Sequence, residues 1–264
     1  MLLREVEYTK PSSIAEALTN LAANDGARAL AGGQTLINVM KARAASPDVL
    51  VDLAGLDELK GIELGSDGTL SIGPMTTYTE LMDSAEARAR PILGEVCAKI
   101  ADVQVRNRGT IGGNVCANDP TNHLPPLMAA IGAQFTITGT DGERTVPASD
   151  FFLGVYMTAV GQTELLTRIT IPAGKHDGFA AVTLGVDGTC IVNAAASMNG
   201  SLRIAIGCVD AVPVLLEVES PDTVRAAVRA AALHPPDDVH ASSEYRAHLA
   251  EVLAERAARQ AVGT

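Results

Sequence analysis

Two short glycine pairs are the residues of this sequence best suited to bind a ligand. The first lies in Ala31 to Leu36 (AGGQTL), and the second closes Val105 to Asn114 (VRNRGTIGGN). Glycine has no Cβ, so backbone N–H groups in such turns can approach phosphate oxygens within hydrogen-bond distance. Both pairs follow apolar runs, so two loops without bulky side chains can face one extended ligand. A dinucleotide with a pyrophosphate fits this arrangement.

Side chains beside the glycines add further donors and charges. Thr35, Thr110 and Asn114 can hydrogen-bond a diphosphate. Arg106 and Arg108 can either contact an anion or pair with acidic residues of the chain. Neither loop has GxGxxG or GxxxxGK(S/T) spacing, which disfavours a Rossmann dehydrogenase and a P-loop enzyme. The alternative is that both glycine pairs only form turns.

The composition is that of a well-packed protein without the features of a nucleic-acid-binding one. Of 264 residues, 47% are hydrophobic and 19% charged, which suffices for a sizeable core. The net charge is −11, only 3% of residues are aromatic and Trp is missing, so nucleic acid is not an expected partner. The sequence shows no signal-peptide pattern and no stretch near the roughly 20 apolar residues of a membrane span. We therefore expect a cytoplasmic protein.

The cysteines and histidines show no metal-binding pattern. Cys97, Cys116, Cys190 and Cys208 include no CxxC pair, so zinc or iron–sulfur spacing is missing and we expect reduced thiols. The five histidines lack HExxH spacing and a recognisable nucleophile context. His123 follows the second glycine loop closely, and it either contacts a cofactor or serves packing.

Residues 1 to about 55 predict a compact βαβ-like unit. Ser13 and Glu16 have capping-box spacing at a helix start, and a strand over 28–31 runs into the first glycine pair. A short apolar strand follows at 49–53. Beyond residue 56 we expect strands at 61–64 and 69–73 joined by a turn at 65–68, a helix opened by Thr77 and Glu80, helices over 91–102 and 124–131, and strands at 134–138, 145–147 and 165–171.

A polar, turn-rich segment at 172–178 predicts a domain boundary near residue 175. After it, two strands flank Asn199-Gly200, the strongest short hairpin signal in the chain. Helices follow over 224–233 and from Ser242-Ser243 onward. In the last helix, one stripe has the spacing of a packed face: Tyr245, Leu249, Val252 and Leu253.

Taken together, the two glycine segments resemble those of a known family. Ala31 to Lys41 (AGGQTLINVMK) with Val105 to Pro120 (VRNRGTIGGNVCANDP) looks like the FAD-binding medium subunit of the molybdenum hydroxylases. That group includes carbon monoxide dehydrogenase, xanthine dehydrogenase and bacterial N-heterocycle dehydrogenases. The likeness extends to 151–154, 164–172 and 238–246, and so covers essentially the whole chain.

The resemblance implies an α+β fold with two domains. Residues 1–175 would form a two-part FAD-binding domain of the vanillyl-alcohol-oxidase/PCMH type, with parts 1–55 and 56–175. Residues 176–264 would form a smaller domain with an antiparallel sheet and a helix bundle. This division agrees with the boundary expected near residue 175.

The resemblance also implies a cradle for FAD, with no catalytic or metal-binding side chain. Two departures from the family concern this cradle: His123 stands where an acidic residue is common, and Ala180 and Ala181 replace a lysine that commonly follows the aromatic residue matched by Phe179. Backbone contacts to the diphosphate are insensitive to both departures. The FAD-binding residues implied are Ala31, Gly32, Gly33, Gln34, Thr35, Leu36, Ile100, Thr110, Ile111, Gly112, Gly113, Asn114, Asp119, His123 and Leu166.

The function that follows is electron transfer within a larger oxidoreductase. Such a subunit takes electrons from a small [2Fe–2S] partner, while a large molybdenum-cofactor subunit carries out the hydroxylation, in a dimer of heterotrimers. The external acceptor is NAD, a quinone or oxygen. Two alternatives stay open from the residues alone: a self-contained flavin oxidase of the same FAD-domain superfamily, and a cofactor-free scaffold whose glycine loops are only structural.

Overall fold

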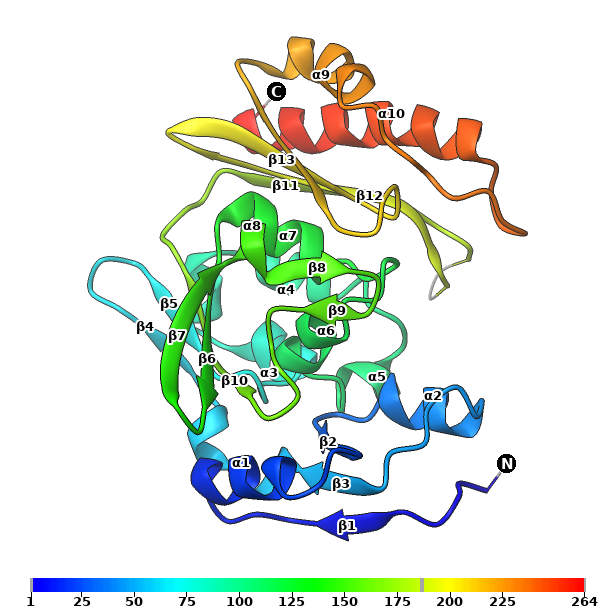
Figure 1. Ribbon diagram of the computed structural model, residues 1–264. Coiled ribbons are helices and arrows are strands. Elements are labelled where there is room, and N and C mark those ends of the chain that lie inside the picture. Colours follow the sequence, from blue (N-terminus) through cyan, green and yellow to red (C-terminus); the bar gives the residue numbers. More distant parts are fainter. Residues whose placement is uncertain (1, 186–187, 264) are drawn as a thin grey trace.

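The computed structural model describes residues 2–185 and 188–263, which form three layers along the molecule (Figure 1). The first is a parallel sheet in the order β1-β3-β2, built from β1 (Glu7–Thr9), β2 (Ala27–Leu30) and β3 (Val49–Asp52). Helices α1 (Ile14–Ala22) and α2 (Leu36–Lys41) connect these strands. The predicted βαβ-like unit is therefore confirmed, and the first glycine pair lies just beyond the carboxyl end of β2.

Local capping explains where two of the helices begin. The Ser13 hydroxyl accepts the N–H of Glu16 at 3.2 Å, as predicted. The Glu16 carboxylate accepts the N–H of Ser12 at 2.8 Å, and not that of Ser13, so this half of the predicted capping box is shifted by one residue. A full capping box joins Thr77 and Glu80 at the start of α3 (Tyr78–Asp83), as predicted. Each cap satisfies N–H groups that the first helical turn leaves free.

The middle layer is an antiparallel sheet with helices packed on it. Its strands lie in the order β4-β5-β10-β6-β7, and the hairpin predicted at 65–68 joins the first two. The strands are β4 (Ile62–Leu64), β5 (Leu70–Ile72), β6 (Gln134–Gly139), β7 (Gly142–Pro147) and β10 (Leu165–Ile171). The remaining helices and the small hairpin of this layer are α4 (Ile92–Cys97), α5 (Val103–Arg106), α6 (Ile111–Ala117), α7 (Leu124–Ile131), α8 (Ala148–Phe151), β8 (Phe152–Gly154) and β9 (Met157–Thr158).

The helix predicted over 91–102 is shorter in the structure. Helix α4 ends at Cys97, and Ala101 has a left-handed backbone with φ of +43°. Asp102 then caps a new helix, because its carboxylate accepts the N–H of Val105 at 2.8 Å. Because of this break, the chain changes direction before the second glycine segment.

The third layer is an antiparallel sheet, β11-β12-β13-β14, covered by the last two helices (Figure 1). Its elements are β11 (Asp177–Thr183), β12 (Cys190–Asn199), β13 (Ser201–Gly207), β14 (Val214–Val218), α9 (Val224–Ala230) and α10 (Ser243–Val262). The hairpin predicted at Asn199-Gly200 joins β12 and β13. One face of the sheet packs on α10, while Ala195 and Ala205 face the core of the middle layer.

The buried face of α10 differs from the predicted stripe. Leu249 and Leu253 are buried as expected, but Tyr245 is 49% exposed. Arg246 is buried in its place because its guanidinium donates to the Ile191 carbonyl and, at 2.8 Å, to the Asp238 carboxylate. Alanines form the rest of this face and let the helix lie close to the sheet: Ala250, Ala254, Ala257, Ala258 and Ala261.

A buried ion pair ties the third layer to the middle one. Arg90, which lies just before α4, donates to both carboxylate oxygens of Asp177 at 2.8 Å. Their side chains are only 1% and 3% exposed. The same guanidinium also donates to Ser197 at 3.0 Å and to the Pro172 carbonyl, so each of its three nitrogens has an acceptor.

Among the described residues, no helix is both long and apolar enough to cross a bilayer.

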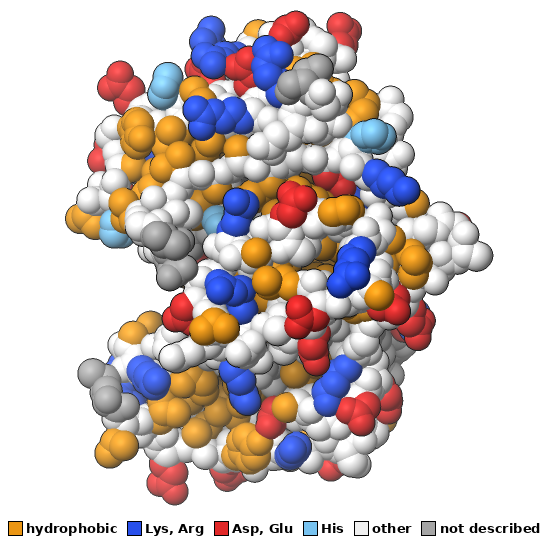
Figure 2. All heavy atoms as spheres, turned by 180° about the vertical axis from the view of Figure 1, so that it is seen from behind, with side chains coloured by type: hydrophobic (Ala, Val, Ile, Leu, Met, Phe, Trp, Pro, Cys, Tyr) orange, Lys and Arg blue, Asp and Glu red, His pale blue; other side chains and the backbone are white. Residues whose placement is uncertain are grey.

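On the face drawn in Figure 2, Lys and Arg side chains are interspersed with Asp and Glu side chains, and apolar side chains gather on the lower part. Figure 1 places the N-terminal sheet at that end of the molecule.

Candidate functional site

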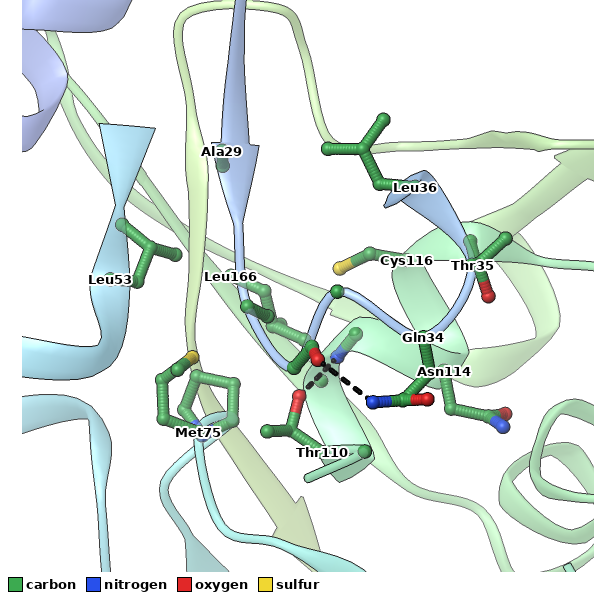
Figure 3. A pocket seen from close by; sticks show the side chains of 18 of the residues that line it. Ala29, Gln34, Thr35, Leu36, Leu53, Met75, Thr110, Asn114, Cys116 and Leu166 are labelled. Carbon is green, nitrogen blue, oxygen red and sulfur yellow. Dashed lines mark hydrogen bonds between the residues drawn. The ribbon is translucent and has the colours of Figure 1, made fainter. Parts of the chain in front are cut away.

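The two glycine segments, far apart in sequence, touch each other in the structure (Figure 3). A Cβ on Gly32 would lie 2.1 Å from the carbonyl oxygen of Arg108 and 2.9 Å from the Cα of Gly109. A Cβ on Gly113 would lie 3.4 Å from the Cβ of Ala31. Gly32 therefore has a defined packing role, because only a residue without a side chain lets the first segment lie against the backbone of the second.

The second segment is fixed from beneath by the chain that follows β5. The N–H of Gly112 donates to the Pro74 carbonyl at 2.8 Å, and the N–H of Ile111 donates to the Thr76 carbonyl at 2.9 Å. A Cβ on Gly112 would lie 2.3 Å from the Cβ of Pro74. Thr110 caps α6, since its hydroxyl accepts the N–H of Gly113 at 3.0 Å. The amides of this segment are thus bonded within the protein.

The first segment, in contrast, leaves its amides free. Within residues 2–185 and 188–263, the N–H groups from Gly32 to Leu36 have no acceptor in the protein. Gly33 has a φ of +74°, in the left-handed region that glycine adopts without strain. The Gln34 side chain donates to the Gly32 carbonyl at 3.3 Å (Figure 3). Five consecutive donors are therefore available to an anionic ligand.

A cavity of about 720 Å³ lies where these segments meet. This volume is within the range of sites for small molecules and cofactors. Its wall combines the polar glycine segments with apolar side chains from the first and middle layers, including Leu53, Met75 and Leu165. Of the residues expected to bind FAD, those in the wall are Ala31, Gly32, Gly33, Gln34, Thr35, Leu36, Thr110, Gly112, Gly113, Asn114 and Leu166.

Asn114 presents an unused hydrogen-bond acceptor at this wall. Its side-chain nitrogen donates to the Tyr78 hydroxyl at 2.9 Å, but its Oδ1 atom is buried and has no partner. Burial raises the pKa of Tyr78 above its usual value, so this hydroxyl stays neutral. A buried polar atom without a partner is costly unless a bound molecule supplies one. The Asn114 oxygen thus fits a ligand that carries a hydroxyl or N–H group.

The cavity also has one charge of each sign in its wall. Arg28 is part of the wall, and its guanidinium donates to the carbonyl of the neighbouring Ala27 at 2.7 Å. Glu164 accepts the N–H of Gly161 at 2.7 Å and a hydrogen bond from Arg144 at 2.8 Å. The bond from Arg144 lowers the pKa of Glu164, so this carboxylate is ionised at neutral pH.

Four of the expected FAD-binding residues do not line the cavity: Ile100, Ile111, Asp119 and His123. Ile111 is fully buried in the core of the middle layer, and Ile100 packs against the same core. Asp119 accepts a hydrogen bond at 2.9 Å from Tyr156, which is itself in the wall. His123 is 7% exposed and packs edge-on against the Phe179 ring, with centroids 5.3 Å apart.

Sequence reasoning missed a part of the wall that comes from outside the glycine segments. Arg28 and Leu165 each lie within three residues of a position that was expected, so sequence proximity was a usable signal for them. Pro74, Met75 and Leu53 carried no such signal. They reach the cavity only because β5 and β3 end beside it.

Cysteine and metal chemistry do not account for this cavity. Cys116 lies in the wall, but burial raises the pKa of its thiol to about 12, which keeps it protonated and unreactive. Across the described part of the chain, no three His, Cys, Asp or Glu side chains are grouped so that they can hold a metal ion.

Comparison with known proteins gives consistent similarities. A family described as the FAD binding domain in molybdopterin dehydrogenase matches residues 4–174. The chain is 36% identical to the carbon monoxide dehydrogenase medium chain of Hydrogenophaga pseudoflava, over 97% of both chains. It is 28% identical to the xanthine dehydrogenase FAD-binding subunit of Escherichia coli O157:H7, over 97% of this chain and 95% of that one. Its fold matches a chain of reconstituted CO dehydrogenase from Oligotropha carboxidovorans with a TM-score of 0.92 and 34% identity, over 100% of this chain and 99% of that one.

Proposed function

Because the chain belongs to the family of FAD-binding domains in molybdopterin dehydrogenases, we propose that it is the electron-transfer subunit of a molybdenum hydroxylase complex. FAD is its cofactor, and it is part of an oxidoreductase. In the proposed role it takes electrons from [2Fe–2S] clusters of a partner subunit and delivers them to an external acceptor. The observation that carries this proposal is the set of free amides from Gly32 to Leu36 in the wall of a cofactor-sized cavity.

The residues present fit FAD at both its charged and its polar parts. We assign the diphosphate to the free N–H groups of Gly32 to Leu36, with the Thr35 hydroxyl as a further donor. The orphaned Oδ1 of Asn114 accepts a hydrogen bond from a hydroxyl or N–H of the cofactor. Apolar side chains, Leu53, Met75 and Leu166 among them, exclude water from the rest of the site.

The second glycine segment has a supporting part in this proposal. Its amides at Ile111, Gly112 and Gly113 are bonded to Thr76, Pro74 and Thr110, so it holds the first segment in place and closes the cavity. Bound FAD supplies the redox centre, which accepts and releases electrons. The protein itself positions the cofactor, and no side chain acts as an acid or base in the proposal.

The proposed assembly contains two further kinds of subunit. Relatives of this chain are named medium chains of dehydrogenases, which supports a large subunit and a small one beside it. We propose that the large subunit carries the molybdenum cofactor, that the small subunit carries [2Fe–2S] clusters, and that two such heterotrimers associate in the cytoplasm. The domain division at about residue 175 belongs to the same proposal.

Purification of the tagged full chain from its native host tests this assignment. We expect three chains of different size to copurify, with FAD and molybdenum in equal amounts and iron present. A flavoprotein that purifies alone and turns over an organic substrate would instead support a self-contained oxidase. A colourless chain that stays colourless after FAD is added would reject the flavin site itself.

A further inference from the structure

A buried cluster outside the cavity brings two cysteines together with a histidine. Cys190 begins β12 and Cys208 directly follows β13, the neighbouring strand. The two cysteines are only 2% and 5% exposed, and one side-chain nitrogen, that of Asn193, lies within hydrogen-bond distance of both sulfurs. His123, which directly precedes α7, lies on the other side of Asn193, with its Nδ1 atom 3.1 Å from the same Asn193 nitrogen. Asn193 pairs with Gly207 across β12 and β13, and this pairing brings near each other two cysteines that are 18 positions apart in sequence.

Asn193 holds this cluster together. Its side-chain nitrogen lies 3.4 Å from the Cys190 sulfur, 3.7 Å from the Cys208 sulfur and 3.1 Å from Nδ1 of His123. Its Oδ1 atom is buried without a partner. Donors around a sulfur atom stabilise the thiolate, which is the reactive form of cysteine.

The two thiols differ in acidity. The interaction with Cys208, with smaller contributions from His123 and Asn193, lowers the pKa of Cys190 although burial opposes it. The same interaction raises the pKa of Cys208. Cys97 lacks such donors, and burial raises its pKa to about 12. One thiolate beside one thiol is the arrangement of a nucleophile with its resolving partner.

We propose that Cys190 and Cys208 are a redox-active pair that hydrogen peroxide converts into a disulfide. The Cys190 thiolate attacks one peroxide oxygen, so that an S–O bond forms, the O–O bond breaks and hydroxide leaves to take up a proton as water. The Cys208 sulfur then attacks the sulfenic acid, an S–S bond forms, and the S–O bond breaks with release of a second water. Both sulfurs are oxidised by one electron each, and peroxide is reduced by two.

The location suits this chemistry and no metal chemistry. In the parts of the chain that the structure describes, no three His, Cys, Asp or Glu side chains are grouped so that they can hold a metal ion, and Cys190, Cys208 and His123 are no exception. Peroxide is close to water in size, so it is the class of oxidant suited to cysteines that are only 2% and 5% exposed. Because the same Asn193 nitrogen lies 3.4 Å from one sulfur and 3.7 Å from the other, the two thiols are close enough that movement of their side chains can form an S–S bond of about 2.05 Å.

Peptide mapping of the folded full chain tests the proposal, whether or not FAD is bound. After peroxide treatment and alkylation, free thiols in the denatured protein should fall from four to two, and dithiothreitol should restore them. Trypsin should release 176–203 joined to 204–225, lighter by two hydrogen atoms than the sum of the separate peptides. Four remaining thiols, or equal oxidation of Cys97 and Cys116, would overturn the proposal.

Two variants separate the pair from general cysteine oxidation. Cys97→Ala removes a buried thiol outside the cluster, and its thiols should fall from three to one with the same linked peptides. Cys208→Ser should give no linked peptides, and Cys190 should keep an added oxygen instead. Linked peptides that persist in Cys208→Ser would contradict the assignment. Circular dichroism before and after treatment confirms that the fold is intact.

Discussion

The contact between the two glycine segments makes Gly32→Ala the sharpest test of the proposed FAD site. The new Cβ would lie 2.1 Å from the Arg108 carbonyl oxygen, whereas ordinary contact begins at 3.4 Å. The obstructing atom belongs to the backbone, so no rotation of a side chain relieves the overlap. The segments must separate by about 1.3 Å to restore that contact.

The expected loss of affinity follows from the length of hydrogen bonds. Bonds from N–H groups to phosphate oxygens are about 2.7–2.9 Å long, and a displacement of more than 1 Å breaks them. A hydrogen bond to a charged group contributes about 1.5–3 kcal/mol. Loss of one such bond should raise the Kd for FAD by roughly 10- to 150-fold.

Fluorescence titration measures this effect directly. FAD is titrated into the full chain stripped of flavin, and quenching of its emission gives the Kd for wild type and variant. Gly94→Ala is the matched control, because its Cβ would come no closer than 3.9 Å to another residue and it lies in α4, outside the cavity wall. Its Kd should stay within about twofold of wild type, which is about 0.4 kcal/mol. A folded Gly32→Ala protein with an unchanged Kd would refute the reasoning.

Two further substitutions test ion pairs that stabilise the fold, one between layers and one within the third layer. Arg90→Ala leaves the carboxylate of Asp177 buried without its partner, so urea denaturation should show that the free energy of unfolding falls by about 3–5 kcal/mol. A decrease below about 1 kcal/mol, which is the contribution of an exposed ion pair, would show that this contact does not hold the layers together. The pKa of Asp238 is lowered from 3.8 to about 2 by N–H bonds from His240 and Ala241 and by Arg246. Because its pKa is lower in the folded protein, ionised Asp238 stabilises the fold above pH 3.8, and this stabilisation is lost as the pH falls toward 2. Asp238→Asn should therefore lower the Tm at neutral pH and match wild type near pH 2; equal Tm values at both would contradict this role for Asp238.

Local chemistry made much of the fold predictable. The turns at 65–68 and Asn199-Gly200 and the capping box of Thr77 and Glu80 depend on residues within a few positions of one another, and all three are present. The helix over 91–102 was predicted too long, since periodicity does not reveal the left-handed backbone of Ala101. Features set by neighbours in sequence were predicted better than those set by neighbours in space.

The candidate site shows the same limit. The composition of the glycine segments predicted that they form part of the site. Which segment has free N–H groups depends on Pro74 and Thr76, whose carbonyls accept those of the second segment, and nothing in the sequence connects these two residues to it. Tyr245 was expected inside because it is large and in register, yet Arg246 is buried instead because its guanidinium finds acceptors there. The periodicity of apolar residues does not predict hydrogen bonds between segments that are distant in sequence.

The support beneath the second glycine segment has a consequence for how the protein acquires its cofactor. With its N–H groups already bonded to Pro74 and Thr76, this side of the cradle exists before any ligand arrives. A preformed receptor loses little conformational entropy on binding, so more of the contact energy remains as affinity. The ordering that accompanies binding should therefore fall on the first segment, whose N–H groups from Gly32 to Leu36 have no acceptor within the described residues.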